Sequence, residues 1–150
     1  MTRADKAKAL FLEGYNCAQA VFGAFCEDFG IDFETGVKIS SGFGGGISRR
    51  REVCGAVSGA VMVLSMKYGY DGAKASEEKK ALYKKVQEVL GGFEDEVGSI
   101  ICRELLNLKE KVSDPTPSER NEKYYAKRPC AELVYISAKL TEDYINNHSE

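Results

Sequence analysis

The sequence lacks the features that mark several large functional classes. Its net charge of −2 and pI of about 5.6 leave no excess of basic residues for binding nucleic acid. The longest uncharged run, residues 53–66, is shorter than the roughly 20 apolar residues of a membrane-spanning helix. The first residues, MTRADKAKALFLEGYN, lack the continuous apolar stretch of a secretory signal. We therefore expect a cytoplasmic protein that neither binds nucleic acid nor inserts into a membrane.

Histidine and closely spaced cysteine pairs are also scarce. His148 is the only histidine, and no two of the five cysteines have the spacing C-x-x-C. The local spacing therefore does not indicate a zinc finger, a zinc ribbon or a dithiol motif. Because a cytoplasmic protein keeps its thiols reduced, a disulfide framework is not expected either. Three explanations remain for the cysteines: metal binding, catalysis or packing.

The sequence does contain apolar residues at helical spacing along nearly its whole length. Thr2, Asn16 and Asp32 precede the first three apolar segments as potential N-caps, and Gly14 and Gly30 follow two of them. The pattern predicts helices over residues 2–14, 17–29, 32–39, 54–68, 76–90, 99–106 and 129–145. Within these segments, Ile39 is expected on an apolar face, Ser99 as an N-cap and Pro129 in a first helical turn.

Two stretches are predicted to be irregular. Residues 40–48 hold four glycines but lack the lysine of a phosphate-binding loop. Residues 109–128 hold two prolines, several charges and little periodicity, although Tyr124 and Tyr125 indicate that this stretch packs back onto the body. No strand is expected. The predicted fold class is all-α, a single-domain helical bundle of about six or seven helices over residues 1–150.

Four of the five cysteines share one local context, the beginning of a predicted helix: Cys17, Cys54, Cys102 and Cys130. The first turn of a helix presents unpaired N–H groups and the positive end of the helix dipole, so it should favour the thiolate. Arg51, Arg103 and Arg128 would act in the same direction if they point toward the sulfurs. A solvated face is the alternative interpretation of the arginine triplet at residues 49–51.

Cys26 does not share this context. Nine residues separate it from Cys17, and nine steps of about 100° place the two cysteines on opposite faces of one helix. We therefore expect Cys26 in the core, on the side of Phe22 and Phe29. Packing alone is also an alternative explanation for the other four cysteines.

The string CGAVSG at residues 54–59, preceded by Cys17 and followed by Cys102 and Cys130, resembles the C_GCAxxG_C_C family of redox-active proteins. Four further segments are similar to that family: GYNCAQAV at 14–21, SGFGGG at 41–46, CRELL at 102–106 and PC at 129–130. The resemblance spans nearly the whole chain. It implies that these four cysteines are the defining ones and that Cys26 is incidental.

The resemblance also extends to a domain of split-Soret cytochromes, which implies electron-transfer chemistry and an iron–sulfur centre. This chain has no haem-attachment CxxCH motif, so a haem is not implied. Gly55 and Gly59 leave one side of the following helix almost bare. Two interpretations stay open for Gly55: close packing against another backbone, or space for a cluster or substrate beside the Cys54 sulfur.

Three functions are compatible with these residues. In the favoured one, Cys17, Cys54, Cys102 and Cys130 hold an iron–sulfur cluster or another thiolate-bound metal and transfer electrons. The second is metal-free thiol–disulfide chemistry, and the third is a structural zinc site without redox activity. The expected partners are a redox partner and, as an option, a second copy of the chain in a homodimer. The sequence does not decide whether the protein is an enzyme.

Overall fold

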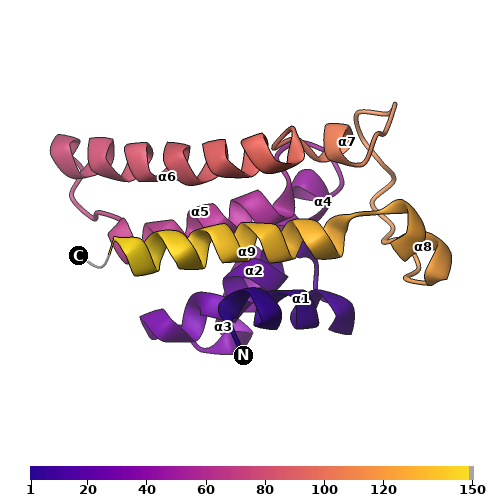
Figure 1. Cartoon of the computed structure of the whole chain (residues 1–150), viewed down its shortest axis with the longest axis horizontal. Helices are drawn as coiled ribbons and strands as arrows, with labels where there is room; N and C mark the ends of the chain where they lie inside the picture. Colours follow the sequence, from indigo (N-terminus) through magenta and orange to yellow (C-terminus); the bar gives the residue numbers. More distant parts are fainter. Residues whose placement is uncertain (149–150) are drawn as a thin grey trace.

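Helices account for most of the chain (Figure 1). The structure is a computed structural model that describes residues 1–148 and, of residues 126 and 127, the backbone alone. Its α-helices are α1 (Arg3–Glu13), α2 (Cys17–Phe25), α3 (Phe33–Ser40), α4 (Gly44–Ile47), α5 (Gly55–Tyr68), α6 (Ser76–Val97), α7 (Cys102–Leu105), α8 (Glu122–Lys127) and α9 (Cys130–Asn147). Two short 3₁₀ helices are η1 (Cys26–Phe29) and η2 (Ser41–Phe43). The predicted all-α class is confirmed.

The first two helices begin as their sequences predict. Thr2 and Asp5 form a capping box at the start of α1, in which each side chain accepts a bond from the other residue's backbone N–H. Asn16 forms the same arrangement with Gln19 at the start of α2. Gly14, with φ 124°, ends α1 in a conformation that favours glycine. These caps are local, which is why the sequence alone identifies them.

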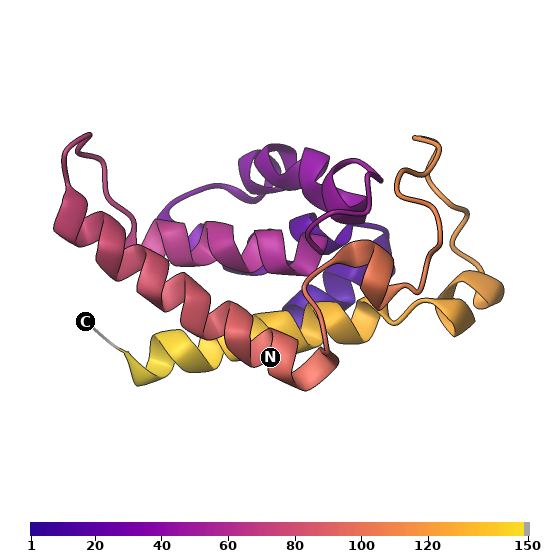
Figure 2. The ribbon, with the colours of Figure 1, turned by 90° about the horizontal axis from the view of Figure 1, so that it is seen from above.

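The helices lie in layers (Figures 1 and 2). Helix α6 forms the upper layer of Figure 1, α5 and α9 lie beneath it, and α1, α2 and α3 form the lower part. Helix α2 packs against α1 and α5, and α9 packs against α1, α5 and α6. The largest apolar side chains that are fully buried between them are Phe11, Val21, Val57, Val63, Leu64, Phe93 and Val134. The N-termini of α2, α5 and α9 therefore come together at one end of the bundle, where α4 and α7 also lie.

Two predictions for the first half of the chain need correction. The helix expected over residues 17–29 changes to a 3₁₀ turn at Cys26, although Gly30 ends it as expected. Ile39, expected on an apolar face, is 53% exposed. The buried positions of α3 are Gly36 and Ser40, one turn apart, because a Cβ on Gly36 would lie only 2.5 Å from the Cys26 sulfur. The helix approaches the core through its small residues, and this turns Ile39 outward.

The second half differs in three places. The stretch over 109–128, expected to be irregular, contains α8, which Asn121 caps by accepting from the backbone of Tyr124. Ser99 is not the N-cap of α7; the cap is Ile101, whose N–H donates to the Ser99 hydroxyl at 3.0 Å. Pro129 is the N-cap of α9 rather than a residue of its first turn. None of the helices described is long and apolar enough to cross a bilayer.

Candidate functional site

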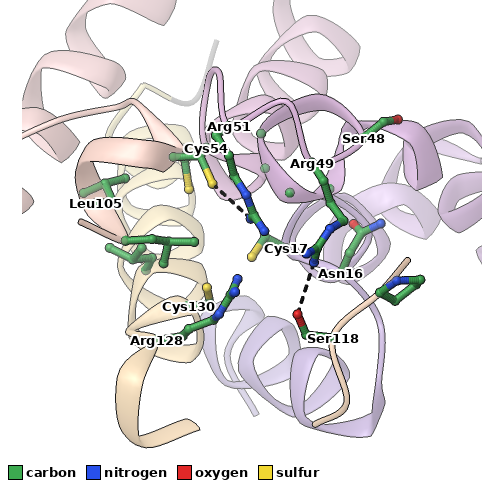
Figure 3. A pocket seen from close by; sticks show the side chains of 18 of the residues that line it. Asn16, Cys17, Ser48, Arg49, Arg51, Cys54, Leu105, Ser118, Arg128 and Cys130 are labelled. Atoms are coloured by element: carbon green, nitrogen blue, oxygen red, sulfur yellow. Dashed lines mark hydrogen bonds between the residues drawn. The ribbon is translucent and has the colours of Figure 1, made fainter. Parts of the chain in front are cut away.

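The four cysteines expected to act together line one pocket of about 420 Å³. Cys17, Cys102 and Cys130 are the first residues of α2, α7 and α9, and Cys54 is the N-cap of α5. Their predicted position at helix N-termini is confirmed. Figure 3 shows the side chains of Cys17, Cys54 and Cys130 in this pocket. All the cysteines are free thiols.

Cys26 lies elsewhere, as predicted. It is fully buried beside Gly36, and its thiol lies 3.7 Å from the carbonyl oxygen of Gly23. It is part of the hydrophobic core and does not line the pocket. The prediction from helix geometry that Cys26 lies in the core, away from Cys17, is therefore confirmed.

Cys54 and Cys102 are brought together by a short backbone pairing. The N–H of Cys54 donates to the carbonyl of Ile100 at 2.8 Å, and the N–H of Cys102 donates to the carbonyl of Glu52 at 2.6 Å. Val53 and Ile101 form an isolated antiparallel bridge between these bonds. A single bridge has no sequence pattern of its own, so it could not be predicted. It holds the beginnings of α5 and α7 side by side.

Cys17 is held next to the glycine-rich segment. The Asn16 side chain, besides capping α2, donates to the carbonyl of Ser41 at 2.9 Å. The backbone of Gly46, whose φ is 67°, also lies against Cys102. A Cβ on Gly46 would lie only 2.6 Å from the Cβ of Cys102. The segment follows a left-handed path through residues 45–49, which L-amino acids rarely adopt. It therefore behaves as the predicted irregular turn, although part of it is assigned to α4.

The glycines after Cys54 serve close helix packing. A Cβ on Gly55 would lie 3.1 Å from both the backbone nitrogen of Ala18 and the Cβ of Cys17. A Cβ on Gly59 would lie 2.8 Å from the Cβ of Val21. The first of the two interpretations of Gly55 is thus supported, and its consequence is that α5 brings Cys54 close to Cys17. Gly55 also lines the pocket; a role in binding a cofactor stays a prediction.

Burial changes the acidity of the pocket thiols. It raises the pKa of Cys54 to about 12, because desolvation of the thiolate outweighs the hydrogen bonds from the first-turn N–H groups of Ala56 and Val57. Burial also raises the pKa of Cys102 although Arg51 donates to its sulfur at 3.7 Å. The expectation that a helix N-terminus makes these thiols ionise more easily is therefore wrong for the metal-free protein.

The thiols of Cys17 and Cys130 change each other's acidity. The interaction with the Cys17 thiol is the main cause that lowers the pKa of Cys130, and the charges of Arg128, Arg51 and Arg120 add to it. The same interaction, together with burial, raises the pKa of Cys17. Of the thiols in the pocket, Cys130 is therefore the one whose thiolate is favoured.

Within the described part of the chain, four arginines line the pocket: Arg49, Arg51, Arg120 and Arg128. Arg51 is 2% exposed and reaches Cys102, as expected, while its Nε donates to Ser113 at 2.9 Å. Arg128 also faces the pocket as expected (Figure 3). Arg103 does not, because its guanidinium turns to the Arg51 carbonyl at 3.1 Å and to Glu52 at 3.5 Å.

Arg49 and Arg120 were not expected in the site. Arg49 donates to the carbonyl of Asp114 at 2.6 Å and to Ser118 at 3.2 Å. Arg120 donates to the backbone carbonyls of Phe11 and Tyr15. Both therefore join residues 109–128 to distant parts of the chain. No local spacing signals such contacts; the triplet at 49–51 was the only hint for Arg49.

The four sulfurs converge on the pocket without meeting at a single point. Within residues 1–148, no three histidine, cysteine, aspartate or glutamate side chains are grouped closely enough to hold one metal ion. Leu105, Leu106 and Leu133 add apolar surface to the pocket wall, which also includes polar side chains such as Asn16 and Ser118. The arrangement thus offers four thiols, a positive charge and partial exclusion of water.

An all-helical fold with four cysteines at helix N-termini around one pocket defines the class of this protein. The chain belongs to the C_GCAxxG_C_C family: residues 15–144 match the family model described as "Putative redox-active protein (C_GCAxxG_C_C)". It is also similar to an "Uncharacterized protein" of Archaeoglobus fulgidus, with 30% identity over 152 residues and 94% of each chain covered. No solved structure matches the chain. The predicted family is confirmed, and the redox character of the site rests on the family description and on its thiols.

Proposed function

We propose that Cys17, Cys54, Cys102 and Cys130 hold an iron–sulfur cluster and that the protein passes electrons to a redox partner. The observation that carries this proposal is the convergence of four free thiols, from four different helix N-termini, on one pocket. Four thiolates are the usual donor set of iron–sulfur clusters. Backbone N–H groups near the sulfurs and burial are the features by which proteins set the reduction potential of such centres.

A buried arginine provides an independent test of whether the pocket fits an anionic cluster. Arg51 is almost fully buried, and its Nη2 atom has no hydrogen-bond partner among residues 1–148. A buried N–H group of a cation is costly unless an anion or an acceptor meets it. A centre ligated by four thiolates carries negative charge, so it fits a pocket with this guanidinium beside Cys102.

The donor geometry favours a cluster over a single ion. A closed zinc site needs four ligands around one metal, and in the described part of the chain no three candidate ligands are so grouped. A cluster distributes its thiolates over several irons, so its four cysteines need not meet at one atom. When bound, it would supply one-electron transfer. The chain's own residues would hold it, balance its charge through Arg51 and Arg128, and limit the access of water.

A specific observation favours one second candidate, metal-free thiol–disulfide exchange by Cys17 and Cys130. Both thiols line the pocket, and each changes the pKa of the other. The Cys130 thiolate would attack a disulfide of a partner molecule, forming a mixed disulfide and releasing one partner thiolate. The Cys17 sulfur, losing its proton, would then attack Cys130 and release the second partner thiolate. The balance is two protein thiols oxidised and one partner disulfide reduced.

The deciding experiment is anaerobic purification, followed by an absorption spectrum and by analysis for iron, acid-labile sulfide and zinc. We expect iron and sulfide in fixed ratio to the protein and visible absorption that dithionite bleaches. The alternative result is a colourless, metal-free protein that loses two titratable thiols on oxidation, while its Cys17→Ser variant does not lose them. This result would favour the dithiol pair over the cluster. Zinc without sulfide would show a structural site instead.

A further inference from the structure

The positive charge of the pocket is not balanced by the protein. The pocket lining includes Arg49, Arg51, Arg120 and Arg128, and no aspartate or glutamate among residues 1–148 lines it. None of these arginines forms an ion pair with a carboxylate in that part of the chain. The chain as a whole has a net charge of −2, so this concentration of cations is not a consequence of composition.

Two carboxylates whose charges act on Arg49, those of Glu110 and Asp114, form hydrogen bonds elsewhere. Glu110 accepts from the Ser113 hydroxyl at 2.8 Å, and Ser113 in turn accepts from Arg51 at 2.9 Å, so Glu110 touches the guanidinium only through a hydroxyl. Asp114 accepts from the backbone of Thr116 at 2.8 Å. Both carboxylates are exposed, and neither lines the pocket.

The arginines differ in the donors they have left. Arg120 uses both terminal nitrogens on the backbone carbonyls of Phe11 and Tyr15. Arg51 keeps Nη2, which is buried and unpartnered in the described residues. Arg128 lies over the Tyr124 ring at 5.1 Å, and in residues 1–148 its guanidinium makes no hydrogen bond. Arg51 and Arg128 therefore hold the donors that a ligand can use.

The like charges also act on one another. Burial is the main cause that lowers the pKa of Arg49, and the neighbouring charges of Arg51 and Arg128 lower it further. Figure 3 shows the three guanidinium groups directed into the same space, close to Cys17 and Cys130. A bound anion would relieve this repulsion and satisfy the buried Nη2 donor.

We propose that this pocket binds a small organic anion, whose carboxylate or phosphate group contacts Arg51 and Arg128 and whose apolar part rests on Leu105, Leu106 and Leu133. Guanidinium groups bind such oxyanions through two parallel hydrogen bonds. A volume of about 420 Å³ is that of a small-molecule site. The inference goes beyond the proposed cluster: in the metal-free protein the anion would be the partner of Arg51 and Arg128, and in the loaded protein it would share these two arginines with the cluster.

The test is a calorimetric titration of the full-length protein, as purified and after removal of bound metal with a chelator. Succinate and inorganic phosphate are the probes, and neutral succinamide is the control ligand, all at constant ionic strength. We expect saturable binding of at least one anion and none of succinamide. The two probes distinguish a carboxylate ligand from a phosphate ligand. Absence of saturable anion binding from both preparations would overturn the proposal.

Variants locate the binding. Arg128→Gln should weaken anion binding about tenfold or more, because it removes the positive charge and the paired donors of the guanidinium group. Arg128→Lys should bind the anion more tightly than Arg128→Gln but more weakly than the unchanged protein. Lysine keeps the charge but lacks the two parallel N–H donors of a guanidinium group. Arg103→Gln is the matched control, because Arg103 is paired with Glu52 and lies outside the pocket lining. Equal effects of Arg103→Gln and Arg128→Gln would overturn the assignment. Iron content, measured separately, tests the cluster, so the two proposals can fail independently.

Discussion

Burial and charge act in opposite directions on the thiols of the pocket, and the result differs from residue to residue. Burial dominates at Cys54, whose pKa rises to about 12. At Cys130 the interaction with Cys17 and the neighbouring arginines dominate, so its pKa lies below the ordinary thiol value of 9.0. The position at a helix N-terminus, common to both, does not decide their acidity. Acidity depends on contacts that become visible only in the folded protein.

This contrast predicts the order of alkylation in the metal-free protein. Iodoacetamide reacts with the thiolate, so Cys130 should be modified first, with a rate that reaches half its maximum below pH 9.0. Cys54 should stay nearly unmodified over the same pH range. Peptide mass spectrometry after short exposure between about pH 6 and pH 9 measures the order. Cys17→Ala should slow the reaction of Cys130, because it removes the interaction that lowers the pKa of Cys130 most. Earlier modification of Cys54 would contradict this expectation.

At the scale of the elements, small residues decide how closely α2 and α5 approach. Gly59→Ala should lower the free energy of unfolding by about 1–3 kcal/mol, because its Cβ would lie 2.8 Å from the Cβ of Val21 and 3.0 Å from the carbonyl oxygen of Ala18. Urea denaturation measures the change. The matched control is Gly91→Ala in α6, where nothing lies within 4 Å of the added Cβ.

The control substitution is expected to change the free energy of unfolding in the opposite direction. Alanine is favoured over glycine inside a helix, so Gly91→Ala should raise the free energy of unfolding by about 0.5–1 kcal/mol. If both substitutions changed stability in the same direction, glycine content rather than packing would explain the effect, and the close approach of α2 to α5 would lose its support.

The sequence predicts the elements better than it predicts their contacts. The caps of α1 and α2 are formed by residues three positions apart, so Asn16 and Gln19 can be recognised without a structure. The bridge between Val53 and Ile101 joins segments 48 positions apart and leaves no local pattern. Arg120, in a stretch without periodicity, belongs to the pocket only because the folded chain brings it to Tyr15.

The same reasoning explains which part of the site was predictable. The predicted beginnings of helices identify four cysteines as site residues: Cys17, Cys54, Cys102 and Cys130. The nine-residue spacing between Cys17 and Cys26 excludes Cys26 from the site. The pairing of Cys17 with Cys130 requires α2 and α9 to pack together, which periodicity does not specify. The predicted role of Arg103 fails for a related reason, since its side chain meets Glu52 before it can reach the sulfurs.

At the scale of the whole molecule, residues 109–128 cover one side of the pocket. Pro115, Pro117 and Ser118 line the pocket, and Arg120 ties the stretch to the carbonyls of α1 and of Tyr15. Without that tie, the stretch would depend mainly on the hydrogen bonds that Arg49 and Arg51 make to residues 113–118. Access to the thiols should therefore depend on Arg120.

Arg120→Ala should speed hydrogen exchange in residues 109–121 by about tenfold, because it removes charged hydrogen bonds that hold the stretch closed. Alkylation of Cys130 should become faster in parallel. Hydrogen exchange read by mass spectrometry measures the first effect. Arg50→Ala is the control, since Arg50 is exposed and does not line the pocket. An unchanged exchange rate in the Arg120 variant would show that the cover is held by other contacts.

In the proposed function, four cysteines form one redox centre and the fifth does not belong to it. The most direct test is the iron and sulfide content of five anaerobically purified variants: Cys17→Ser, Cys54→Ser, Cys102→Ser, Cys130→Ser and Cys26→Ser. Each of the first four should lose most of the iron and the visible absorption, whereas Cys26→Ser should keep both and lose only some stability. Full iron content in any of the first four, or its loss in Cys26→Ser alone, would contradict the assignment.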